Sequence, residues 1–217
     1  MKRMALLSVA FAAMLTVGCR GDRPYSNAEN PNEAIGTSGY PAETAKPADR
    51  GTQKFVEHMM MDGMAEVQLG KLASEHAQNT AVKEFAQTMV RDHSKAGAEL
   101  KQLAAHNHME VPSPAQLDEK HQELMDKLSK LHGAEFDHEY MEAMVDGHRD
   151  VLNDMQSRVD EKPFGGEREG EVQPEKSTNP TAYSVNAWAA KTLPTVREHL
   201  DRARQVQKNL SHRATNP

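Results

Sequence analysis

Apolar residues recur every three or four positions in four long stretches of the chain, a spacing that places them on one face of an α-helix. The stretches span about 52–77, from 80 to the break at 111–114, from 134 to the residue before Pro163, and about 181–210. The second stretch is especially regular, with Val82, Phe85, Met89, His93, Ala96, Leu100 and Leu103 in register. Each stretch predicts an amphipathic helix whose apolar face needs a partner.

Capping and breaking residues set the expected ends of these helices. Asn79 or Thr80 is a typical cap for the second helix, and the prolines at 112 and 114 end it. A shorter helix with leucines at 117, 124, 128 and 131 then connects to the third and ends at Gly133. Residues 164–180 predict a long exposed loop, and Pro194 predicts a kink in the last helix or a restart of it. The pattern predicts an all-α, antiparallel four-helix bundle with a short connecting helix.

The first residues have the organisation of an export signal. Two basic residues open the chain, an apolar run occupies residues 4–17, and Cys19 follows a glycine. The end of this run, from Leu15 to Cys19, resembles the bacterial lipobox, in which the cysteine is lipidated and becomes the first residue of the mature protein. We therefore expect a signal peptide at 1–18 and attachment to a membrane through Cys19. The alternative is an ordinary cleaved signal whose cysteine is incidental.

The composition of the next segment separates the anchor from the helices. Residues 20–50 are rich in Pro, Gly, Asn, Ser and Thr and have few large apolar side chains, so they cannot offset the entropy of ordering. We expect a flexible tether at 19–50, the bundle at 51–212 and a disordered tail at 213–217. An anchor of this kind predicts the periplasmic face of the cell envelope. No aspartate follows Cys19, which favours the outer membrane.

Charge and cysteine content narrow the expected partners and chemistry. The 26 Lys and Arg residues are outnumbered by 32 Asp and Glu, and the net charge of -6 argues against nucleic acid as a partner. Cys19 is the single cysteine, which excludes an intrachain disulfide. A phosphate-binding glycine loop and a serine elbow are both absent from the sequence, so nothing in it requires an enzyme.

Each long helix carries one polar residue on or beside its apolar stripe, and these are Glu66, His93, His148 and His199. Glu66 lies 13 residues before Asn79 and His93 lies 14 after it, so in an antiparallel hairpin both sit roughly 20 Å from the bend. We expect the four side chains to meet at one level of the bundle. Imidazoles with a carboxylate suit zinc, copper or iron.

Two interpretations of this set remain open on sequence grounds. The residues could bind one transition metal, helped by further oxygen ligands or hydrogen-bond acceptors from Asp62, Asp92, Asp150 and Glu198. They could equally form a hydrogen-bonded structural network without metal. A carboxylate-bridged di-iron centre is disfavoured, because the residues three before His93 and His199 are valines rather than glutamates. The methionines at 59–61 and 64 could serve copper(I) or simply fill the core.

Several of these residues, in this order, resemble the ferritin-like domain-of-unknown-function 4142 family, whose members are bacterial envelope proteins often described as outer membrane proteins. The resemblance rests on Phe55, Glu66, Val67, Leu69, Gly70, Leu72, Ala73, Val82, Phe85, Ala86, Met89, Asp92, His93, Leu100, Phe136, Tyr140, His148, Leu193, Pro194 and His199. It covers about 52–210 and implies a ferritin-like bundle and an exported location. It implies no reaction, because the family's role is unsettled by name, and the 164–180 loop is longer than the family usually has.

The leading hypothesis is a lipid-anchored, ferritin-like bundle that holds a single metal ion between Glu66, His93, His148 and His199. A second hypothesis is an envelope stress or interaction module whose core histidines are structural. A third is a metal-dependent redox or storage protein. The sequence identifies neither the metal nor a protein partner.

Overall fold

The computed structural model describes residues 46–112, 117–161 and 172–215, all within the unit that spans Tyr40–Pro217. The predicted signal peptide at 1–18, Cys19, the predicted tether as far as residue 45 and residues 216–217 lie outside the described residues. None of the helices in the described ranges has both the length and the apolar character needed to cross a bilayer.

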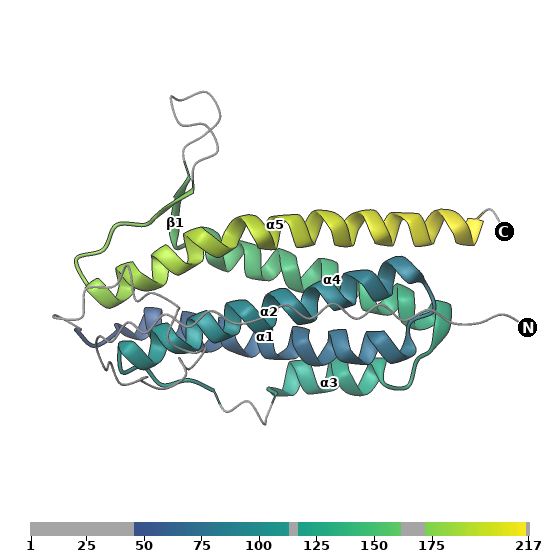
Figure 1. The fold of residues 1–217 in the computed structure, drawn as a ribbon, viewed down its shortest axis with the longest axis horizontal. Coiled ribbons are helices and arrows are strands. Elements are labelled where there is room, and N and C mark those ends of the chain that lie inside the picture. Colours follow the sequence, from purple (N-terminus) through teal and green to yellow (C-terminus); the bar gives the residue numbers. More distant parts are fainter. Residues whose placement is uncertain (1–45, 113–116, 162–171, 216–217) are drawn as a thin grey trace, which may run out of the picture. The chain divides into compact units, whose positions relative to one another are not determined.

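Five helices make up the described fold, and their order along the chain follows the predicted one (Figure 1). They are α1 (Arg50–His76), α2 (Thr80–His106), α3 (Glu119–Leu128), α4 (Gly133–Gln156) and α5 (Pro180–Thr215). The predicted all-α bundle with a short connecting helix is confirmed. Pro194 lies inside α5, which is one uninterrupted helix through this position.

Two expectations about helix ends need correction. α4 ends at Gln156, and Val159 belongs to strand β1 (Val159–Glu161), which pairs antiparallel with β2 (Val172–Pro174). Val159 is buried, so its place in the apolar pattern comes from the strand instead of from a further helical turn. Gly133 begins α4 instead of merely ending the connector. Its φ of 63° is a conformation that glycine adopts without steric cost.

Side-chain caps account for the start of three helices. Asp49 accepts a hydrogen bond from the Thr52 N–H at 2.8 Å, and Asn79 accepts one from the Ala81 N–H at 2.8 Å. Asp118 accepts one from the His121 N–H at 2.9 Å at the start of α3. These caps satisfy backbone donors that have no partner within the helix, which is why helices begin at these positions.

Polar contacts at the two ends of the bundle fix the helix directions. The bend between α1 and α2 lies beside the start of α4, because the N–H groups of Gln78 and Asn79 donate to the buried Asp137 carboxylate at 3.1 and 2.9 Å. At the other end, Thr181 Oγ1 of α5 is 3.0 Å from Asn107 Oδ1, just after α2. α1 is therefore antiparallel to α2, and α4 to α5, while α2 and α4 run the same way. The chain from α2 to α4 must cross the length of the bundle, as in ferritin-like folds.

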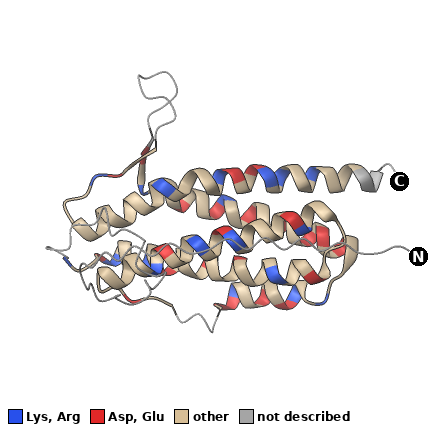
Figure 2. Cartoon of the chain, in the orientation of Figure 1, with Lys and Arg blue, Asp and Glu red and all other residues tan. Residues whose placement is uncertain are grey.

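The core consists of two apolar clusters separated along the helix axes. One lies near the α1–α2 bend and includes Leu69, Phe85, Phe136 and Leu200, and the other includes Phe55, Leu100, Met155 and Trp188. In all four long helices the two clusters leave a gap at the same level. Charged residues are spread along the helices (Figure 2). In this gap the buried side chains are those of Glu66, His148 and His199, together with the small Ala65.

We expect Gly70→Ala to lower the free energy of unfolding by about 1–3 kcal/mol, the usual cost of overpacking a close contact. A Cβ at Gly70 would lie 2.8 Å from Val90 Cγ2 and 2.9 Å from the Ala86 carbonyl oxygen, so α1 and α2 would have to separate. Urea denaturation at neutral pH measures the change.

Gly97→Ala is the matched control, because a Cβ there meets nothing within 4 Å among the described residues. This variant should gain up to about 1 kcal/mol from the better helix propensity of alanine. Equal stabilities for the two variants would contradict the close α1–α2 packing.

Candidate metal centre

Three histidines from three helices meet in the polar gap between the apolar clusters. His93 comes from α2, His148 from α4 and His199 from α5, and their ring centroids form a nearly equilateral triangle with sides of 5.5–5.6 Å. Each ring offers one nitrogen, and these nitrogens lie within 4.8 Å of one another. His148 and His199 are buried, and His93 is partly buried.

Hydrogen bonds at the outer edge of two rings fix which nitrogen carries the proton. His148 Nδ1 lies 2.8 Å from the Met144 carbonyl oxygen, which only accepts, so Nδ1 is the protonated nitrogen. His199 Nε2 lies 3.0 Å from Asp92 Oδ2 and donates to it in the same way. The lone pair is therefore left on Nε2 of His148 and on Nδ1 of His199.

These two nitrogens, and one nitrogen of the His93 ring, are buried without a partner. Within the described ranges, His93 Nε2, His148 Nε2 and His199 Nδ1 make no hydrogen bond, although each is shielded from solvent. A buried polar atom without a partner costs roughly 1–3 kcal/mol, and native structures contain few of them. Three such atoms at one level therefore call for a ligand that accepts electron pairs.

Burial keeps the three imidazoles neutral. Desolvation, followed by repulsion from the other two rings, lowers the pKa of His93 to about 3. Desolvation and the neighbouring His199 lower the pKa of His148 to about 4, and desolvation lowers the pKa of His199 despite its bond to Asp92. The lone pairs are therefore available to a metal ion at neutral pH, without competition from protons.

Glu66 of α1 lies at the same level but behind His148. Its Oε1 is 3.5 Å from His148 Nδ1, the nitrogen that bonds to Met144, so the carboxyl group is beside the ring edge opposite the lone pair. Glu66 is absent from the set of groups close enough to share an ion, which comprises the three histidines among the described residues. Desolvation and the nearby Asp62 raise the pKa of Glu66 to about 8.

The four predicted auxiliary acids have different surroundings. Asp92 holds His199, as described above. Asp62 lines a hollow of about 40 Å³ that also touches His93 and His199, together with Met59 and Met155. Asp150 is exposed and pairs with Lys120 at 3.8 Å, and Glu198 is exposed on α5. The structure therefore brings Asp62 and Asp92 close to the histidines and leaves Asp150 and Glu198 at the surface.

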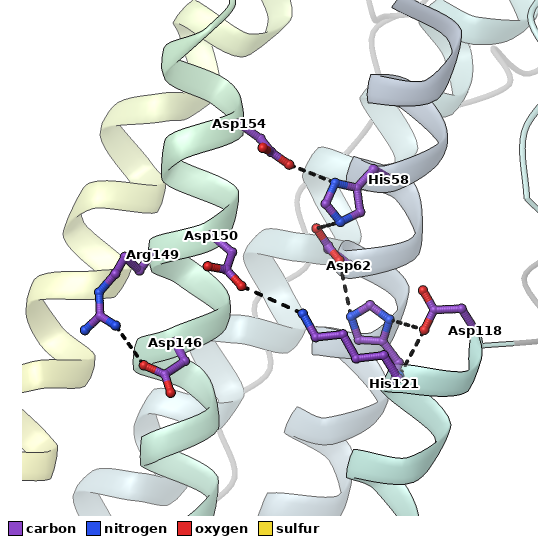
Figure 3. Close-up of polar contacts among 9 residues, drawn as sticks. His58, Asp62, Asp118, His121, Asp146, Arg149, Asp150 and Asp154 are labelled. Atoms are coloured by element: carbon purple, nitrogen blue, oxygen red, sulfur yellow. Dashed lines mark hydrogen bonds and ion pairs between the residues drawn. The ribbon is translucent and has the colours of Figure 1, made fainter. Parts of the chain in front are cut away.

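A second polar cluster, which the sequence analysis did not predict, joins α1, α3 and α4. Asp62 lies between two histidines, with Oδ2 3.4 Å from His58 Nε2 and Oδ1 3.2 Å from His121 Nε2 (Figure 3). His121 also contacts Asp118, and His58 contacts Asp154. One feature of the sequence could have predicted the position of His121. Its spacing from Leu124 and Leu128 places it on the inward face of α3.

Comparison with known proteins now identifies the family. The family model described as "Domain of unknown function (DUF4142)" matches residues 38–162, more than half of the 217 residues. The chain belongs to the DUF4142 family. The fold is similar to that in the crystal structure of a DUF305 fragment from Deinococcus radiodurans, with a TM-score of 0.56 and 15% identity over 77% of this chain and 99% of that chain. No curated protein matches this chain.

The DUF4142 match is shorter than the expected resemblance over 52–210. It includes α1 to α4, and with them Glu66, His93 and His148, but it ends before α5. His199 therefore joins the site from a helix outside the matched region. Its bond to Asp92 of α2 ties that helix to the DUF4142 core.

Glu66→Gln should flatten the pH dependence of stability of the metal-free DUF4142 protein between pH 6.5 and about 8. The folded state holds Glu66 protonated up to about pH 8, whereas the unfolded chain ionises near 4.5. The unfolded state therefore binds fewer protons as pH rises, and stability falls by roughly 1.4 kcal/mol per pH unit in that window. Urea denaturation of wild type and variant with a chelator present gives the difference.

The histidines of the site do not mask this effect. His93 and His148 have lowered pKa values, so their contribution is complete above the unfolded value of 6.5 and is lost only as pH falls toward about 3 to 4. The raised pKa of His121, caused mainly by its bond to Asp62, affects both proteins alike. Glu123→Gln, an exposed change on α3, is the control. Parallel curves for wild type and Glu66→Gln would contradict the burial of a protonated Glu66.

Proposed function

We propose that this protein binds one transition-metal ion between His93, His148 and His199, and that a lipid on Cys19 holds the domain at the cell envelope. The observation that carries the metal site is the set of three neutral, unpartnered ring nitrogens contributed by three helices to one buried level. A buried histidine with a purely structural role is expected to have hydrogen-bond partners on both ring nitrogens. A histidine that binds a metal ion has a hydrogen-bond partner on one nitrogen and leaves the other for the ion.

The donor set and its spacing fit such an ion. Metal–nitrogen bonds of about 2.0–2.1 Å place tetrahedral donors roughly 3.4 Å apart, so nitrogens within 4.8 Å need to approach by little more than an ångström. Imidazole nitrogen suits zinc, copper and iron. The carboxylate of Asp92 on the far nitrogen of His199, and the Met144 carbonyl on that of His148, are the partners that orient ligating histidines in metal sites.

Three protein ligands leave one coordination position for water or a small ligand. The 40 Å³ hollow beside His93 and His199 has room for about one water molecule. Glu66 is placed behind His148 and contributes to the polarity of the level instead of coordinating. The arrangement supports metal binding directly, and a redox or storage role would follow from the identity of the metal.

The alternative of a purely structural histidine network finds less support in the geometry. Such a network is expected to satisfy its buried nitrogens by hydrogen bonds. Here the rings face one another at angles and distances that leave one nitrogen of each without a partner in the described part of the chain.

The proposed location rests on the sequence. The signal-like residues 1–18 and the lipobox-like string that ends at Cys19 support export and lipidation, with the outer membrane favoured by the absence of aspartate after the cysteine. The periplasmic side would then be the compartment in which the bundle meets its metal.

Purified, untagged protein should contain or take up one metal ion per chain, and a His93→Ala/His199→Ala variant should lose it. The variant removes two of three ligands, so binding at stoichiometric concentrations should disappear. Metal analysis and titration with Zn²⁺ after chelation measure this. A saturating ion at about 100 times its dissociation constant should also stabilise wild type by about 2.7 kcal/mol.

His138→Ala is the matched control, since this partly buried histidine of α4 lies in the first turns of the helix, away from the three ligands. It should keep the full metal content. A folded wild-type protein that takes up neither zinc, copper nor iron would eliminate the proposed site, as would unchanged metal content in the double variant.

Cys19→Ser should release the mature domain from membranes while leaving its export intact. Serine cannot form the thioether to the lipid, and the tether beyond it has little apolar surface of its own. Fractionation of cells into soluble periplasm and membranes, followed by immunoblotting, measures the redistribution. Mature wild-type protein whose mass shows no lipid on Cys19 would exclude the lipid as the anchor.

A further inference from the structure

A cleft of about 330 Å³ opens between α1, α3 and α4, next to the histidine level. Four of its lining residues are acidic, namely Asp62, Glu66, Asp146 and Asp150. Its basic lining residues are Lys120, which is exposed and pairs with Asp150, and His58 and His121, which both contact Asp62. The cleft therefore carries excess negative charge on the side of the bundle where α3 covers α1.

Titratable residues lead inward along one face of α1. His58, Asp62 and Glu66 are spaced four apart and so share one helix face. Their side chains become less exposed in that order, from 48% to 14% to 11%. Across the cleft, Asp154, Asp150 and Asp146 follow the same four-residue spacing on α4 (Figure 3).

The inner end of this row of residues reaches the candidate metal centre. Asp62 and Val151 line both the cleft and the small hollow that touches His93 and His199, so these two side chains stand between them. At the floor of the cleft, Glu66 is buried, with 8% of the whole residue exposed. Its Oε2 has no hydrogen-bond partner among the described residues. A cation that displaced the proton of this carboxyl group would give the unpartnered oxygen a partner.

A second hollow also reaches His93 but has the opposite charge. The groove between α1 and α2, of about 410 Å³, is lined by Lys71 and Lys101 and by no carboxylate. Its remaining lining is mostly apolar, including Met60 and Met64. A divalent cation is repelled by the two lysines and gains nothing from the apolar walls, so electrostatics favours the cleft despite its smaller volume.

We infer that the cleft is the access route for the metal ion, with Asp62 and Glu66 forming an outer cation site from which the ion passes to the three histidines. This inference rests on the proposed metal site. The ligand class is a hydrated divalent transition-metal cation. Asp62 exchanges its contacts with His58 and His121 for the cation and then delivers it past Val151 to the hollow beside His93 and His199.

Carboxylates on the route speed the arrival of the ion, while the neutral histidines hold it. A cleft whose charge is opposite to that of the ion raises the association rate by about 10- to 1,000-fold, and this gain falls as salt screens the charges. A residue that lies only on the route lowers the barrier in both directions, so its removal slows association and dissociation together. Removal of a true ligand instead raises the dissociation rate.

The test uses full-length protein from which metal has been removed with a chelator. Co²⁺ is added in a stopped-flow instrument, and its visible absorption reports coordination by the histidines. We expect Asp62→Asn to slow loading about tenfold, with a much smaller change in the dissociation constant. Asp150→Asn should slow loading less, because Asp150 is at the exposed rim. Lys120→Gln should accelerate loading, because it removes the positive charge at the mouth. Wild-type loading should slow with added salt.

Asp126→Asn is the matched control for charge removal, since Asp126 is exposed on α3 and does not line the cleft. Lys71→Gln tests the competing groove, and neither change should alter loading. Because Asp62 also contacts α3, the exposed Asp150 and Lys120 variants keep the test valid if Asp62→Asn loosens that helix. Opposite effects of these two variants support the route.

Three outcomes would overturn the inference. Equal loading rates in Asp62→Asn, Asp150→Asn and wild type would show that the cleft is not used, and acceleration by Lys71→Gln alone would assign the route to the groove. A large rise in the dissociation rate of Asp62→Asn would make Asp62 a ligand. In each case wild type still binds Co²⁺ and the metal site stands. A wild-type protein that binds no ion removes both proposals.

Discussion

The burial of three neutral imidazoles between two apolar clusters is the constraint on which this structure depends. Each of His148 and His199 satisfies one nitrogen at its outer edge, through Met144 and Asp92, and leaves the other facing the centre. Desolvation keeps the rings uncharged, because a protonated imidazole here would be an unpaired buried charge. This polar level requires the three rings to converge. A ring placed elsewhere would lose both its hydrogen bond at the outer edge and its contacts with the other two rings.

The rest of the fold serves that convergence by fixing the helix register. Apolar clusters above and below the level hold all four long helices, and contacts at the ends set how far each helix slides. The buried Asp137 carboxylate ties the start of α4 to the α1–α2 bend, and Thr181 ties the start of α5 to the residue after α2. A shift of one residue along α2, α4 or α5 rotates the side-chain direction by about 100° and would remove the histidine of that helix from the centre.

The sequence predicted the fold and the three converging histidines because both depend on periodicity. His93, His148 and His199 share faces with apolar residues, and counting from the bend at Asn79 placed Glu66 at their level. Counting could not decide the side of His148 on which Glu66 lies, because that depends on rotamers and helix rotation. The cluster of His58, Asp62 and His121 was missed for a similar reason, since it requires knowing which face of α1 the short helix α3 covers. The β1–β2 pair escaped prediction because Val159 also fits a helical spacing.

The separation of neutral ligands from nearby carboxylates explains how one small bundle could both attract and hold a cation. Three imidazoles bring no charge, so a divalent ion among them would keep its charge in a region of low dielectric and would need compensation nearby. Asp92 accepts a hydrogen bond from His199, and Asp62 lines the adjoining hollow. Both carboxylates are close enough to compensate the charge of an ion without taking the place of a histidine ligand. Carboxylates placed directly at the centre would bind the ion more strongly, but without the ion they would repel one another in the core. Neutral donors inside and acids around them would let the bundle fold without metal and still receive the proposed ion.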